Sequence, residues 1–169
     1  MRMKIDGNIA DAYRGAHGLT LVKSSVGLLQ ESLEPGEVAE SMTRAVYGDW
    51  TGIICVTQRR VVFAARFIAT KKVVTATFGE ITSVDGGRDI STSNLTLSVA
   101  GNRMSFRGLA WRDADRIAED IRKGIAAHNA SPSAADPADR LLKLKRLHDA
   151  GVLTDDEYAE RSAPLKSLL

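Results

Sequence analysis

Two short apolar runs separated by a polar pair decide the fold, in the stretch Gly52-Ile53-Ile54-Cys55-Val56-Thr57-Gln58-Arg59-Arg60-Val61-Val62-Phe63. Runs of this length, rich in β-branched residues, predict strands, and Gln58-Arg59 predicts the turn of a hairpin. Similar runs recur on both sides, at 37–46, 51–57, 60–67, 72–79, 81–86, 94–99 and 103–107. We expect seven antiparallel strands, which carry too much apolar area for one flat exposed sheet and should close into a barrel or a sandwich.

Helical spacing of apolar residues precedes and follows the strands. The upstream stripe predicts a short amphipathic helix that ends at Pro35-Gly36, and its members are Leu19, Val22, Val26, Leu29 and Leu33. The downstream stripe predicts a helix that closes an open end of the barrel, with Ala114, Ile117, Ala118, Ile121 and Ile125. We expect the chain before Gly18 to be mobile and Trp111 to pack on the barrel end.

The C-terminal residues 138–169 predict a separate two-helix hairpin. Its first helix ends at Ala150-Gly151, because glycine adopts the left-handed conformation easily. Thr154-Asp155-Asp156-Glu157 has the form of a capping box that begins a second helix. Ser162-Ala163-Pro164 should break or kink that helix. Such a small unit cannot bury its own apolar stripe well, so we expect it to need a partner surface.

The stretch 52–63 resembles the second and third strands of bacterial PH-like domains, in which a Gly-hydrophobic-Thr-x-x-Arg-hydrophobic hairpin recurs. Pro35-Gly36-Glu37 is similar to the start of their first strand. The resemblance implies a mainly β fold with α-helices, a seven-stranded antiparallel PH-like barrel over 35–128 capped by a C-terminal helix. It also implies an interaction or membrane-associated module, and it brings no catalytic residue.

The segment 141–158, with the sequence LLKLKRLHDAGVLTDDEY, resembles the SHOCT motif, a short C-terminal domain appended to many unrelated proteins. This resemblance implies an assembly or docking role. The expected division of the chain is therefore an N-terminal segment with a short helix at 1–34, the barrel at 35–128, a linker at 129–137 and the SHOCT hairpin at 138–169.

The residue inventory argues against catalysis, cofactors and metals. His17, His128 and His148 fall in three different segments, so they show no metal-ligand spacing. Cys55 is flanked by Ile54 and Val56, which predicts a buried thiol rather than a nucleophile. The chain has no phosphate-binding or dinucleotide-binding glycine motif. We therefore expect a protein that is not an enzyme and has no cofactor.

Charge and hydropathy argue against two further classes of protein, nucleic-acid binders and membrane-spanning proteins. A net charge of +2 and an aromatic content of 5% do not suit a nucleic-acid binder. No window approaches the length and apolarity of a membrane span, and no signal peptide is apparent. We expect a cytoplasmic protein, with association at the inner face of the membrane as an option.

Two functional hypotheses follow. In the first, the barrel binds an unknown protein partner and the hairpin drives homo-oligomerisation; docking of the hairpin on its own barrel stays open. The residues expected to mediate assembly are Leu141, Leu144, Leu147, Leu153, Tyr158 and Leu165. In the second, the barrel contacts anionic lipid through Arg66, Lys71 and Lys72, which bracket one hairpin turn. Trp50, at a strand edge, is a candidate exposed anchor, whereas the acidic first loop does not support inositol-phosphate recognition.

Overall fold

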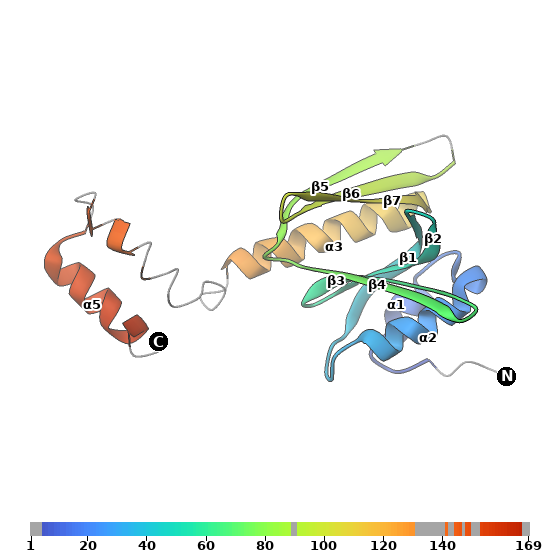
Figure 1. Ribbon diagram of the computed structural model, residues 1–169, viewed down its shortest axis with the longest axis horizontal. Helices are drawn as coiled ribbons and strands as arrows, with labels where there is room; N and C mark the ends of the chain where they lie inside the picture. Colours follow the sequence, from blue (N-terminus) through green and yellow to red (C-terminus); the bar gives the residue numbers. More distant parts are fainter. Residues whose placement is uncertain are drawn as a thin grey trace. The chain divides into compact units, whose positions relative to one another are not determined.

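The computed structural model describes residues 5–88, 91–130, 141, 144–146, 148–149 and 153–166 (Figure 1). The chain divides into two compact units, Met1–His128 and Asn129–Leu169. The predicted residues Leu147, Ala150 and Gly151 lie outside the described residues, and of Leu165 only the helical backbone is described.

One seven-stranded antiparallel sheet forms the body of the first unit. Its strand order is β4-β3-β2-β1-β7-β6-β5, so β4 and β5 are its two edges. The seven predicted strands are confirmed, and their ends differ from the observed ones by at most two residues. The strands are β1 (Ala39–Tyr47), β2 (Trp50–Thr57), β3 (Arg60–Phe67), β4 (Thr70–Thr77), β5 (Ile81–Arg88), β6 (Ser93–Val99) and β7 (Asn102–Leu109).

The helix α3 (Trp111–Ala130) lies between the two halves of this sheet, with β5–β7 on one side and β3–β4 on the other (Figure 1). Its apolar stripe enters the same core as Phe63 and Phe106, whose ring centroids are 5.8 Å apart. The predicted closing helix is confirmed, since it buries Ala114, Ile117, Ala118 and Ile121 in that core. Trp111 remains 45% exposed, contrary to the expectation that it packs on the barrel end.

A second core lies on the outer face of β1, β2 and β3. Three short N-terminal elements cover this face: α1 (Ala10–Arg14), η1 (Leu19–Val22) and α2 (Lys23–Ser32). They pack against Met42, Ile53, Cys55, Val62 and Ala64. Strands β2 and β3 are therefore buried on both faces, which explains why their sequences are continuously apolar rather than alternating.

The N-terminal helix predicted over 19–33 is present, with its first turn in the tighter 3₁₀ form. The expectation of a mobile segment before Gly18 was wrong for the described residues. Ile9 is fully buried, and Ala39 donates a backbone hydrogen bond of 2.9 Å to Asn8. The apolar outer face of the sheet needs this cover, because it would otherwise face water.

The residues of the PH-like sequence motif converge on one buried carboxylate, that of Glu37. The Arg60 guanidinium donates to both of its oxygens, at 2.9 and 2.7 Å, and Thr57 Oγ1 donates at 2.8 Å. The Glu34 amide donates a fourth bond of 2.8 Å. Burial is the largest single effect on this carboxyl and raises its pKa, but the hydrogen bonds, with that from Arg60 foremost, outweigh it and lower the pKa of Glu37 to about 2. The network fixes the β2–β3 hairpin to the start of β1.

In the second unit the described residues 141, 144–146 and 148–149 are helical, and α5 spans Asp155–Lys166. The predicted capping box is confirmed: the Thr154 amide donates to Glu157 at 3.0 Å, and the Glu157 amide donates to Thr154 Oγ1 at 3.3 Å. Pro164 lies inside α5 and does not end it. The side chain of His148 stacks on the Tyr158 ring at 4.8 Å, so the two helical segments contact each other.

Candidate functional site

The three most exposed large apolar side chains of the described residues gather at one cleft. Leu21 is 80% exposed, Phe67 is 70% exposed and Ile68 is 86% exposed. The cleft has a volume of about 640 Å³, and its other lining residues are Val22, Ser24, Ser25, Asp49, Trp50, Thr51, Arg66 and Thr70. A cluster of bulky apolar groups in water costs solvation free energy, so it marks an interaction site. We call Leu21, Phe67 and Ile68 the apolar tip.

The β3–β4 hairpin presents two of these side chains in a strained turn. Phe67 and Thr70 are the closing pair of the ladder, and Thr70 Oγ1 donates to the Phe67 carbonyl at 2.8 Å. Ile68 therefore falls in the turn, where its φ is +51°. A β-branched residue is unfavourable in this left-handed region, because its Cβ crowds the backbone. An isoleucine that is both strained and exposed does not help the fold, so its side chain is better explained by binding.

Hydrogen bonds hold the hairpin against the N-terminal helices. The Arg66 amide donates to Ser25 Oγ at 3.0 Å, and Ser24 Oγ donates to the Arg66 carbonyl at 3.1 Å. The Arg66 guanidinium bonds Glu31 of α2, with a shortest distance of 2.7 Å. That bond, together with the charges of Arg66 and Lys71, lowers the pKa of Glu31. These bonds fix the hairpin beside α2, and the hairpin, the η1–α2 segment and the β1–β2 turn together line the cleft.

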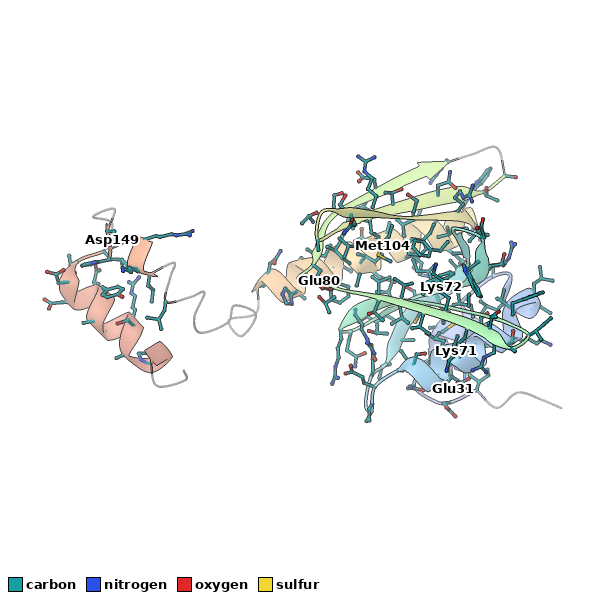
Figure 2. The ribbon with its side chains drawn as sticks, in the orientation of Figure 1. Glu31, Lys71, Lys72, Glu80, Met104 and Asp149 are labelled. Carbon is teal, nitrogen blue, oxygen red and sulfur yellow. The ribbon has the colours of Figure 1, made fainter. Side chains whose placement is uncertain are left out.

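The three basic residues expected to contact lipid do not share one face. Arg66 and Lys71 are cross-strand partners, so their side chains lie on the face toward α2. Lys72 pairs with the inward-facing Ala65, and its ammonium lies 5.1 Å from the centre of the Tyr47 ring. Figure 2 shows Lys71 on the side of the hairpin toward Glu31 and Lys72 on the opposite side. The structure brings together Arg66 and Lys71 only.

Trp50 and the acidic turn before it both border the cleft. Trp50 is half-buried, lines the cleft and packs on the inner core. Asp49 also lines the cleft and brings one negative charge to it. The cleft is therefore amphipathic, with an apolar tip, Arg66 on one wall and Asp49 on another.

The residues expected to mediate assembly lie in the second unit. Leu141 and Leu144 are half-buried, and Leu153 is 9% exposed. Tyr158 is half-buried and holds the ring contact with His148. Leu153 and Tyr158 thus serve the packing of the unit itself, whereas Leu141 and Leu144 are half-buried leucines with a part of their surface accessible.

The described residues offer little for catalysis. Cys55 is fully buried, and burial followed by the charges of Glu37 and Glu40 raises the pKa of its thiol. The expectation of a core cysteine is confirmed. Within the described ranges no three His, Cys, Asp or Glu side chains form a group that could hold a metal ion. Nor does any helix among them have the length and apolarity to cross a membrane.

The chain matches no known family model, and no curated protein sequence matches it. Among solved structures it is similar to the C-terminal domain of an unknown protein from Leishmania infantum, with a TM-score of 0.45 and 11% identity over 59% of this chain and 96% of that chain. It is also similar to the Vps36 N-terminal PH domain, with a TM-score of 0.46 and 11% identity over 59% of this chain and 86% of that one. The chain's own strand order and its closing helix α3 define its fold.

Sequence reasoning missed the apolar tip. It singled out the basic residues around the β3–β4 turn and passed over the apolar pair between them. The signal was present, because Phe67-Ile68-Ala69 is an apolar run where turn-forming polar residues are usual. Leu21 carried no such signal, since it sits in a stretch that reads as an ordinary amphipathic helix.

Proposed function

We propose that this chain is a non-enzymatic interaction protein whose PH-like body binds an apolar segment of a protein partner in the cleft beside the apolar tip. The observation that carries the proposal is the gathering of Leu21, Phe67 and Ile68, each at least 70% exposed, at one cleft. A partner side chain placed there removes these groups from water at about 25 cal/mol per Å². Arg66 and Asp49 at the walls offer polar contacts that orient the partner.

A display library of random peptides tests this proposal. Peptides selected on the full chain should carry bulky apolar residues and bind the double variant Phe67→Ser, Ile68→Ser at least about tenfold more weakly, which is ~1.4 kcal/mol. Val38→Ser is the matched control, because Val38 is 47% exposed but does not line the cleft. Selected peptides that bind the double variant as tightly as the parent would overturn the proposed site.

We further propose that the C-terminal unit mediates self-association through its leucine stripe. Leu141 and Leu144 are the described leucines that stay partly accessible, and the unit is too small to bury a full stripe. Light scattering on the full chain and on a truncation ending at Ala135 measures the effect. The full chain should be an oligomer and the truncation a monomer, and Leu144→Asp combined with Leu147→Asp should match the truncation.

A peripheral membrane module is the second candidate, and one observation favours it. Arg66 and Lys71 lie on one face directly behind the exposed Phe67 and Ile68. An apolar tip flanked by cations suits an anionic bilayer, in which each basic residue contributes about 1 kcal/mol. Flotation with phosphatidylserine vesicles at low and high salt separates the candidates. Salt-sensitive flotation that Lys71→Gln weakens and Phe67→Ser abolishes would favour the membrane over a peptide partner.

A further inference from the structure

A second, smaller pocket lies away from the apolar tip and shares no lining residue with its cleft. It has a volume of about 220 Å³ and is formed where β1, the residues before β6 and the β7–α3 connection meet the N-terminal segment. Its lining residues are His17, Gly18, Thr43, Arg44, Ser91, Thr92, Gly108 and Ala110. Drug-sized ligands occupy about 300–1,000 Å³, so this pocket suits a small group.

The cation of this pocket is left without a described partner. The Nε atom of Arg44 is buried and makes no hydrogen bond to any described residue, and no carboxylate within the described ranges forms an ion pair with Arg44. The side-chain stem of Arg44 passes close to Gly18, because a Cβ added to Gly18 would lie 3.4 and 3.6 Å from Cβ and Cδ of Arg44. A buried guanidinium donor that lacks an acceptor costs free energy unless a ligand supplies one.

The pocket also contains an imidazole that the fold orients. Asp113 is 1% exposed, and its carboxylate accepts bonds from His17 Nδ1 at 3.0 Å, the His17 amide at 3.0 Å and Thr43 Oγ1 at 2.7 Å. The Arg116 guanidinium also lies 3.3 Å away and balances the same carboxylate. Asp113 is therefore saturated with donors. It holds the His17 ring by Nδ1, so Nε2 is the nitrogen left for a ligand, on a side chain that is 64% exposed. Nε2 of the neutral ring accepts a hydrogen bond from a P–OH group, and it donates one to a phosphate oxygen when the ring is protonated.

We propose that this pocket binds a phosphate group. The guanidinium of Arg44 offers a planar fork of donors, which matches the oxygens of a phosphate. His17, Ser91 and Thr92 also line the pocket and add an imidazole and two hydroxyls. None of the lining residues carries a carboxylate, and the Asp113 carboxylate behind His17 and Thr43 is paired with the Arg116 guanidinium. A phosphate there supplies the acceptor that Arg44 Nε lacks.

Nuclear magnetic resonance of the full ¹⁵N-labelled chain tests the proposal, with inorganic phosphate titrated against sodium chloride at constant ionic strength. The amide signals of Gly18, Ser91 and Thr92 should shift with saturation. Arg44→Met should weaken the phosphate affinity about 10- to 100-fold, as expected for loss of charge-assisted hydrogen bonds. Arg103→Met, which removes an exposed arginine of β7 outside the pocket, should leave the affinity unchanged.

Two further arms identify the source of the phosphate group. Glycerol 3-phosphate represents a soluble phosphomonoester, and phosphatidylcholine vesicles with and without phosphatidic acid represent a lipid headgroup. Binding in either arm that Arg44→Met weakens and Arg44→Lys partly restores supports the pocket. Absence of saturable binding in all arms, or equal affinity of the parent and Arg44→Met, would overturn it. The thermal midpoint of each variant without phosphate shows that a lost affinity does not reflect unfolding.

Discussion

The two ends of β3 treat polar and apolar side chains in opposite ways. At the start of the strand, Arg60 enters a largely buried network with Thr57 and the fully buried Glu37. At its end, Phe67 and Ile68 stand in water at 70% and 86% exposure. The first end buries charged groups, which usually stay in water. The second end exposes apolar side chains, which are usually buried. The first arrangement is fully hydrogen-bonded and serves the fold, whereas the second lacks compensation in the described chain and so points to binding.

The largest change in the free energy of unfolding should come from removing a charge of the buried network at the start of β3. Arg60→Met leaves the Glu37 carboxylate buried without its bidentate partner, which should lower the free energy of unfolding by ~3 kcal/mol. Arg59→Met is the control, because Arg59 bonds Glu34 at the surface with both side chains more than half exposed. Its effect should stay below ~1 kcal/mol. Urea denaturation measures both, and equal losses in the two variants would contradict the network.

Low pH should weaken the same Glu37–Arg60 network. The pKa of Glu37 is about 2 in the folded chain, below its ordinary value of 4.5. The Glu37 carboxyl therefore binds a proton more readily in the unfolded chain than in the folded chain. Its contribution to the free energy of unfolding is complete above about pH 4.5 and is lost as the pH falls toward 2. The free energy of unfolding of the parent chain, measured as a function of pH, should fall by ~2–3 kcal/mol over this range. Glu37→Gln should start less stable and show a shallower acid dependence over this window, and an unchanged slope would sink the assignment.

A smaller effect, of opposite sign, should appear at the exposed end. Ile68→Gly relieves the positive φ and should raise the free energy of unfolding by ~0.5–1 kcal/mol, after allowance for the extra freedom of glycine in the unfolded chain. The same change should weaken binding of tip-selected peptides. Ala100→Gly is the matched control, since Ala100 has a φ of +47° in the β6–β7 turn. It should stabilise the chain to a similar extent and leave peptide binding intact.

The smallest effect on stability should come from Glu31→Gln. Glu31 and Arg66 form a solvent-exposed pair, and such pairs contribute little to folding. The change frees the Arg66 guanidinium beside the apolar tip, so it should leave the urea midpoint nearly unchanged. If the membrane candidate is correct, it should strengthen flotation with anionic vesicles at low salt. Unaltered flotation at every salt concentration would count against Arg66 as a lipid contact.

Local patterns predicted the strands well, because the type of each residue there indicates its backbone conformation and whether it is buried. The β-branched runs and polar turns placed all seven strands, and the Thr154–Glu157 spacing predicted a cap that the hydrogen bonds confirm. The same local reasoning failed for the segment before Gly18. Nothing in Ile9 or Ala12 alone reveals that the outer face of β1–β3 needs a cover, because that need arises from strands distant in the sequence.

The candidate sites depended still more on distant contacts. The β3–β4 turn was identified from its charges, but strand pairing placed Lys72 on the opposite face from Arg66 and Lys71. The cleft also required Leu21, which is more than 40 residues away in sequence from Ile68. Likewise, Arg44, His17 and Ser91 share no motif, and they meet at one pocket only because the N-terminal segment packs on β1 and the sheet brings the residues before β6 near it.

The mainly β fold, the seven strands, the closing helix and the buried cysteine follow from the amino-acid pattern alone, because short-range periodicity and turn chemistry encode secondary structure and burial. The three-dimensional packing is needed to show that Glu37, Thr57 and Arg60 form one network and that Leu21, Phe67 and Ile68 form one apolar surface. These groupings depend on which segments the sheet and its covering helices bring together, and a local pattern carries no information on its distant neighbours.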